Sequence, residues 1–239
     1  MVAIIFKFQL KVKRVSQMSE SDPVQDDFHK SDNTQLIQET EWARIYRVSD
    51  KHTSYKSKFL TDALQISAQQ FAVKWPSMGL RDRLDFASAY SAKPDFTRDD
   101  EQVLEQIMRD GNEQVWSTLA LFMLKHPDRF KILTFLRKRL EEHPREPDNF
   151  IQALGLSKDP GVSEVLLSYW ISCREAAQSV PDREDNTIAQ VAPIARYLLC
   201  CRALWQTTGS EDYLDQIRLY LGHAHSQVRW WAERALQPD

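Results

Sequence analysis

The stretch LYLGHAHSQVRWWAERAL, residues 219–236, decides the fold of this chain. A short apolar segment leads into a turn containing Gly222, and an amphipathic segment follows the turn. The apolar residues of that second segment recur at i, i+3, i+4, i+7 and i+8, which is one stripe of an α-helix. They are Val228, Trp231, Ala232, Ala235 and Leu236. Small residues on such a stripe let a neighbouring helix approach closely, so the stretch predicts a tightly packed helix pair.

The same pattern occurs earlier in the chain. An apolar helix tail, a polar break, a valine and an amphipathic helix recur over residues 103–124, 150–171 and 217–236. The valines are Val115, Val162 and Val228, and the loop at 179–186 makes their spacing unequal. Repetition of a helix pair is the sign of an α-helical repeat protein. We expect the three segments to occupy equivalent places in a stack of helices.

The quoted stretch resembles the HEAT repeat, especially the bacterial HEAT-like form first described in bilin lyases. That form ends one helix in leucine, turns, and continues with Val-Arg and an Ala-x-x-Ala-Leu tail, which Val228, Arg229, Ala232, Ala235 and Leu236 match. The resemblance covers roughly residues 80–237. It is looser in the other two units, where Trp116 and Ser163 replace the usual arginine.

The resemblance implies an all-α fold, a short right-handed α-α superhelix (a HEAT-like solenoid) of antiparallel helix pairs. The tetratricopeptide repeat is a weaker alternative. Pro94 and Pro127 lie about 33 residues apart, near that repeat's period, but its Gly-Tyr signature is missing.

Composition also favours helices. The chain has 239 residues, 42% of them hydrophobic and 27% charged, and only six are glycine. Few glycines mean few tight turns, because glycine is the usual residue where a turn needs positive φ. The net charge of −3 argues against a general polyanion binder, whose affinity comes from clustered Lys and Arg. Three cysteines without a Cys-x-x-Cys motif predict small buried residues in a reducing cytoplasm.

Domain boundaries follow from the N-terminal sequence. Within residues 1–17, an apolar run at 2–6 is followed by strict alternation of apolar and polar side chains over 6–13, and we expect residues 1–17 to be a dispensable extension of a chain that naturally begins at Met18. Residues 18–34 are polar and predict disorder, which leaves 35–239 as one HEAT-like domain. Inside it, residues 35–48 show a weak helical period, 49–52 a break, and 55–75 a helix ended by Pro76. No run of about 18 apolar residues exists, so we expect a cytoplasmic protein without a membrane span.

Trp230 is the first candidate binding residue. It lies off the apolar stripe of its helix, beside Glu233 and Arg234, and an exposed tryptophan near arginine is typical of a binding hot spot. Arg229, Arg234 and Arg202 would line up with it, together with Arg196, if the final helices pack antiparallel. The alternatives are that Trp230 covers the end of the stack, and that the arginines form a solvated face paired with Glu211, Asp212 and Glu233.

Two further clusters were weighed. The segment 129–139 carries five cations and no acid, and Arg137 and Arg139 are its candidate contacts for an acidic partner or nucleic acid, although such a helix is usually a solvated face. His223 and His225 form a His-x-His turn that would need a third ligand to hold a metal, so no metal site is predicted.

Stacked helices present extended surfaces, so the sequence predicts a scaffold or adaptor that binds another protein and has no chemistry or cofactor of its own. Phosphate loops, Gly-x-Ser-x-Gly and His-Glu-x-x-His motifs are missing from the sequence. The resemblance leaves open a HEAT-like enzyme, similar to alkylated-base DNA glycosylases or bilin lyases, with no catalytic residue assigned. A nucleic-acid binder using residues 129–139 is the third alternative, and the acidic net charge speaks against it.

Overall fold

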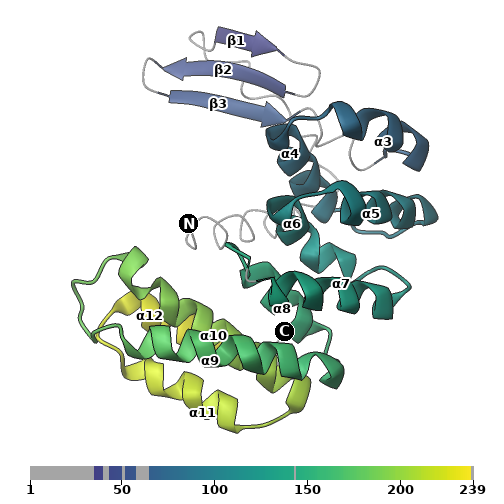
Figure 1. Cartoon of the computed structure of the whole chain (residues 1–239). Helices are drawn as coiled ribbons and strands as arrows, with labels where there is room; N and C mark the ends of the chain where they lie inside the picture. The colour runs from purple at the N-terminus through teal and green to yellow at the C-terminus, as the bar shows by residue number, and fades with distance from the viewer. Residues whose placement is uncertain (1–34, 40–42, 50–51, 58–64, 143, 238–239) are drawn as a thin grey trace, which may run out of the picture. The chain divides into compact units, whose positions relative to one another are not determined.

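The computed structural model describes residues 35–39, 43–49, 52–57, 65–142 and 144–237. The chain divides into two compact units, Met1–Val103 and Leu104–Asp239. The boundary falls inside helix α5 (Arg98–Asp110), and the predicted domain 35–239 therefore extends over both units (Figure 1). The expectations for residues 1–34, including a natural start at Met18, concern residues outside the described ranges.

A three-stranded antiparallel sheet opens the first unit. Its strands are β1 (Gln35–Glu39), β2 (Ala43–Ser49) and β3 (His52–Ser57), in the order β1-β2-β3. The predicted helical period over 35–48 is therefore wrong, although the predicted break at 49–52 coincides with the β2–β3 connection. The predicted helix over 55–75 is wrong at its start, where β3 lies, and confirmed over Ala68–Lys74. In short segments such as these, neither the helical period of 3.6 residues nor the strand period of two is clear. The propensity of Ile45, Tyr46 and Tyr55 favours a strand.

The helical part of the first unit packs around aromatic rings. Its elements are α3 (Ala68–Lys74), the 3-10 helix η2 (Trp75–Ser77), α4 (Leu80–Ser91) and the first turns of α5. The rings of Phe71 and Phe86 lie 5.1 Å apart, and those of Phe86 and Tyr90 5.0 Å apart. Pairs of this kind contribute about 0.5–1.5 kcal/mol beyond their buried area, so they fix how α3 meets α4.

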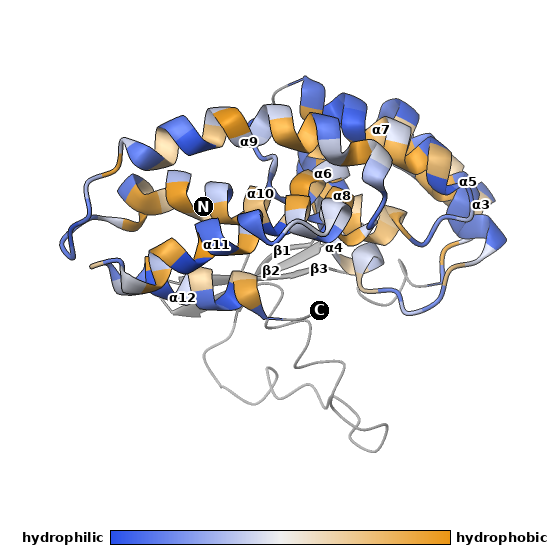
Figure 2. Cartoon of the chain, turned by 90° about the horizontal axis from the view of Figure 1, so that it is seen from below, coloured by the Kyte–Doolittle hydropathy of each residue, from blue (hydrophilic) through white to orange (hydrophobic). Residues whose placement is uncertain are grey.

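The second unit is helical throughout the residues that the structure describes. Its elements are α6 (Glu113–Met123), α7 (Arg129–Glu141), α8 (Asp148–Leu156), η3 (Pro160–Val162), α9 (Ser163–Gln178), α10 (Ile188–Thr208), α11 (Asp212–Arg218), η4 (Leu219–Gly222) and α12 (Ser226–Leu236). The all-α prediction is thus confirmed for residues 65–237, where each described regular element is a helix. Hydrophobic and hydrophilic residues alternate along these helices, as amphipathic packing requires (Figure 2).

Helices α6, α8 and α10 run parallel to one another. Ser117 of α6 is bonded by Asn149 of α8, and the backbone N–H of Glu146, just before α8, donates to Glu113 at the start of α6. Asp148, the first residue of α8, pairs with Arg196 of α10. Near the other end of α8, Gly155 packs directly on Ala203. The matching order of these contacts along the helices establishes the parallel direction.

Helices α10 and α12 are also parallel, not antiparallel as the predicted alignment of the C-terminal arginines required. His225, just before α12, contacts the carbonyl of Asn186 just before α10, and Arg202 of α10 reaches Arg234 near the end of α12. The short helix α11 lies between them in the chain and provides the reversal. Because α11 carries the chain back, the two long helices on either side of it must point the same way.

The connecting helices α7, α9 and α11 pack beside this parallel row. Arg129 at the start of α7 donates to the carbonyl of Ser157 just after α8, so these two helices run antiparallel. Trp170 of α9 meets Tyr213 of α11 edge-on, with ring centroids 5.9 Å apart. Val115 and Val228 lie in helices of the parallel row, whereas Val162 precedes α9, so the three valine-led segments do not occupy equivalent places.

Candidate binding cleft between α9 and α10

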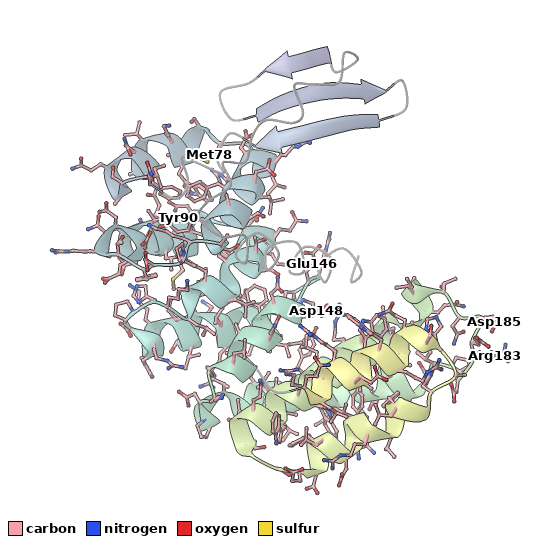
Figure 3. All side chains as sticks on the ribbon, turned by 180° about the vertical axis from the view of Figure 1, so that it is seen from behind. Met78, Tyr90, Glu146, Asp148, Arg183 and Asp185 are labelled. Carbon is pink, nitrogen blue, oxygen red and sulfur yellow. The ribbon has the colours of Figure 1, made fainter. Side chains whose placement is uncertain are left out.

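The cleft arises because α8 is shorter than the two helices that follow it. Asp148 begins α8 and lies level with Arg196, whereas α10 begins at Ile188, about two helical turns earlier. Asp148 is labelled in Figure 3, where α8 begins. The first turns of α10 and the facing end of α9 therefore extend beyond α8, and α8 does not cover them.

This uncovered part of the α9–α10 pair holds a cavity of about 370 Å³. Its lining comes from Tyr169, Ser172, Cys173 and Ala176 of α9 and from Ala189, Ala192, Pro193 and Arg196 of α10. Half of these side chains are alanine or serine, and their small volume leaves the space between two closely packed helices. The cleft is thus mostly apolar with a few polar groups at one end, which is the usual composition of a ligand pocket.

Pro193 lies inside α10. It has no N–H, so α10 lacks the hydrogen bond from residue 193 to the carbonyl of Ala189, and the pyrrolidine ring occupies the place of that donor. Both residues line the cleft, where the ring adds an apolar surface.

Charge is concentrated at the Arg196 end of the cleft. The Nε of Arg196 donates to Oδ1 of Asp148 at 2.9 Å, and both side chains are half-buried. Burial raises the pKa of Tyr169 to about 12, although Arg196 opposes the shift. Tyr169 is consequently a neutral hydroxyl at physiological pH, able both to donate and to accept a hydrogen bond.

Ile188, the first residue of α10, is an exposed apolar side chain next to Ala189 of the cleft, and 43% of its surface is accessible. An exposed apolar side chain beside an apolar cleft is a contact that a partner can cover. Leu167 and Ile171 of α9 are also exposed, but helical spacing places them on the face of α9 opposite to the residues that line the cleft.

The predicted exposure of Trp230 is confirmed, with 39% of its surface accessible. Its predicted neighbours bond mainly to the protein itself. Arg202 donates to the carbonyl of Arg234 at 2.8 Å, near the end of α12, where a cation complements the helix dipole. Arg229 donates to the carbonyls of His223 and Ala224 at 2.7 and 2.6 Å, which fixes the turn before α12. Their role toward a partner stays a prediction.

The basic residues of α7 lie apart from the candidate residues of α10 and α12. Arg139 lies over the Trp116 ring, 4.8 Å from its centroid, and pairs with Glu142. Lys131 pairs with Glu105, and Arg129 bonds the main chain after α8. Arg137 is half-buried on the same helix. The six predicted residues therefore divide between α7 on one side and the α10–α12 pair on the other.

The two histidines of the turn before α12 are buried and hold a loop. His223 Nδ1 lies 3.2 Å from Asp182, and His225 Nε2 lies 2.9 Å from the carbonyl of Asn186. Both contacts reach the α9–α10 loop, whose tip carries Arg183 and Asp185 (Figure 3). Within the described ranges no three His, Cys, Asp or Glu side chains gather as a potential metal site.

The cleft was not predicted from the sequence. A signal was present, because Ala189 and Ala192 with Ala176 and Pro193 interrupt otherwise bulky helices. These small residues indicate a cleft only if α8 leaves them uncovered, and the position of α8 beside α9 and α10 cannot be inferred from the sequence.

No helix in the described part of the chain is long and apolar enough to cross a membrane. Comparison with protein-family models, with curated proteins and with solved structures found no match to this chain.

Proposed function

We propose that this chain is a protein-binding scaffold, a short right-handed solenoid of HEAT-like helix pairs. Two observations support the solenoid. The helices α6, α8, α10 and α12 run parallel, with return helices between them. They begin at intervals of roughly 35 to 40 residues, the period of helical-hairpin repeats. Stacks of this kind expose long surfaces to partners.

The α9–α10 cleft is the observation that carries the binding proposal. A volume of about 370 Å³ accommodates one or two large apolar side chains of a partner segment. The partner is therefore an apolar peptide segment of another protein, with a large side chain as its anchor and the exposed Ile188 beside it.

Site-specific crosslinking tests the position of the partner. A photoreactive amino acid at Ile188 should capture a partner from the source cells, while the same group at the exposed Thr134 of α7 should not. The captured protein is then purified, and its affinity is measured by calorimetry. Equal capture from both positions would count against the cleft.

Filling the cleft tests the same proposal in solution. Ala192→Trp places an indole in the cavity and should weaken binding of the purified partner at least tenfold, about 1.4 kcal/mol. Thr134→Trp adds the same side chain to the exposed face of α7 and should leave the affinity unchanged, with circular dichroism verifying both folds. If Trp230→Ala weakens binding and Ala192→Trp does not, the partner uses α12 instead.

The alternatives remain open to simple tests. A nucleic-acid binder would rely on the cations of α7, but Arg129, Lys131 and Arg139 already contact groups within the protein. A gel-shift measurement at two salt concentrations would detect such binding by its steep loss with salt. No catalytic residue is assigned for the alternative that the chain is a HEAT-like enzyme.

A further inference from the structure

Cys173 and Cys200 meet across the interface of α9 and α10. Their sulfurs lie 3.9 Å apart, and both cysteines are reduced. A disulfide needs the sulfurs at about 2.05 Å, so they must approach by roughly 2 Å, which side-chain rotation and a small helix shift can supply.

The two thiols differ in access. Cys173 lines the α9–α10 cleft, with 7% of its surface exposed, whereas Cys200 is completely buried behind it. A small molecule that enters the cleft can therefore reach the sulfur of Cys173 first. The third cysteine, Cys201, faces another way and accepts a hydrogen bond from the indole N–H of Trp170 at 3.1 Å.

The thiols also differ in acidity. A hydrogen bond from Cys200 lowers the pKa of Cys173, and the nearby Arg196 guanidinium lowers it further, against the effect of burial. Burial raises the pKa of Cys200 well above its usual range, and it raises that of Cys201 to about 11. Cys173 is consequently the thiol that ionises first, and the thiolate is the reactive form.

We propose that Cys173 and Cys200 form a peroxide-sensitive thiol pair, with Cys173 as the attacking and Cys200 as the resolving cysteine. The Cys173 thiolate attacks one oxygen of hydrogen peroxide, an S–O bond forms, the O–O bond breaks, and the released hydroxide takes a proton to become water. The Cys200 sulfur then attacks the sulfenic acid, the S–O bond breaks, and hydroxide leaves with the Cys200 proton as a second water. Two thiols are oxidised to one disulfide, and one peroxide is reduced to two waters.

This chemistry belongs to the isolated protein and does not depend on the proposed partner. Oxidation of Cys173 would nevertheless change the cleft, because Cys173 forms part of its wall. Closing the bond would draw α9 and α10 together at that wall. A failure of the partner experiments would leave the thiol pair unaffected, and the reverse also holds.

Peptide mapping of the wild-type protein is the direct test. After treatment with hydrogen peroxide and alkylation of the remaining thiols, a non-reducing tryptic digest should link residues 159–174 to 197–202, with loss of two of the three free thiols. The second peptide contains both Cys200 and Cys201, so the Cys201→Ala variant must give the same link. A digest without this link, or a link that disappears in Cys201→Ala, would overturn the assignment.

The order of attack is tested separately with a sulfenic-acid probe such as dimedone. In Cys200→Ala the Cys173 sulfenic acid cannot be resolved, so Cys173 should be labelled. In Cys173→Ala neither remaining cysteine should be labelled above the untreated level. Labelling of Cys200 in Cys173→Ala would reverse the assigned roles. The wild-type mapping needs no variant, so it decides the proposal even if an alanine variant folds poorly.

Discussion

The Asp100 carboxylate is completely buried at the start of α5 and accepts hydrogen bonds from four donors. They are the ammonium of Lys93 at 2.7 Å, the hydroxyl of Tyr90, and the backbone N–H and hydroxyl of Thr97 at 2.6 and 2.8 Å. The Thr97 hydroxyl caps α5 by accepting from the Asp100 N–H, and three acids occupy the first turn, as the helix dipole favours. The sequence cannot tell which of the three acids turns inward, because that depends on where Tyr90 and Lys93 lie.

Asp100→Asn should destabilise the first unit by about 3–5 kcal/mol, because it leaves the largely shielded Lys93 ammonium without its counter-charge. Urea unfolding followed by circular dichroism, with hydrogen exchange of the α4 amides, measures the loss. Asp99→Asn changes an exposed acid one residue away and should shift stability by less than about 0.5 kcal/mol. Equal effects of the two changes would show that the buried network contributes little.

The same carboxylate predicts a pH dependence. Burial alone would raise the pKa of Asp100, but the hydrogen bonds from Lys93, Tyr90 and Thr97 lower it below the usual range. A lowered pKa in the folded state means that the contribution to stability is complete above the ordinary aspartate pKa. It is lost as the pH falls through the lowered value. Wild type should therefore lose stability in acid more steeply than Asp100→Asn, and a pair of parallel curves would contradict this.

The helix elements were predictable where a boundary signal is local. Asn112 caps α6, Asp128 caps α7, and α12 (Ser226–Leu236) forms the amphipathic segment predicted after the Gly222 turn. The sequence did not predict which helices are equivalent in the stack. The segment led by Val162 resembles the other two, yet it forms α9, which connects two helices of the parallel row. The place of a helix in the stack depends on its packing against other helices and not only on its own apolar residues. The strands at 35–57 were missed for the related reason that short apolar runs do not distinguish strand from helix.

Gly155 sets how closely α8 approaches α10. A Cβ at this position would lie 2.7 Å from the Cα of Ala203 and 2.6 Å from Oε1 of Gln206. Gly155→Ala gains about 1 kcal/mol of helix propensity, but it overpacks the contact at a cost of about 1–3 kcal/mol. We expect a net loss of about 1 kcal/mol, measured by urea unfolding. A gain in stability would show that α10 moves aside freely.

Gly222→Ala is the matched control for this contact. It makes the same chemical change, but the added Cβ meets no atom within 4 Å. Its stability should stay within about 0.5 kcal/mol of wild type. The comparison separates the close approach of the two helices from any general effect of removing a glycine.

At the scale of the second unit, contacts between distant segments determine what the row of helices can present. The resemblance predicted antiparallel pairs and a surface for a partner, but the cleft exists only because α8 begins about two turns later than α10, beside α9 and α10. Capping residues in the sequence predict where a helix begins and ends. They do not predict how far it extends along a neighbouring helix. The thiol pair is of the same kind, since Cys173 and Cys200 are joined only by the antiparallel packing of their helices.

The α9–α10 loop is held by the turn before α12, and this contact leads to the last prediction. The Asp182 carboxylate accepts from the backbone N–H of Ala224 at 2.7 Å, with His223 beside it. Asp182→Ala should remove the protection of the Ala224 amide in hydrogen exchange and speed exchange across the loop. Overall stability should change by no more than about 1 kcal/mol, since Asp182 is exposed.

Two further variants identify which property of Asp182 matters. Asp182→Asn keeps a carbonyl oxygen that can accept from Ala224, so the protection of that amide should survive even though the charge is gone. Asp185→Ala removes an exposed acid from the tip of the same loop and should leave the Ala224 amide protected (Figure 3). If Asp182→Asn exchanges as fast as Asp182→Ala, the negative charge of Asp182, and not an acceptor oxygen alone, holds the loop. If Asp185→Ala exchanges equally fast, a contact of Asp182 with the turn is not what holds it, and the order of this loop comes from α9 and α10 themselves.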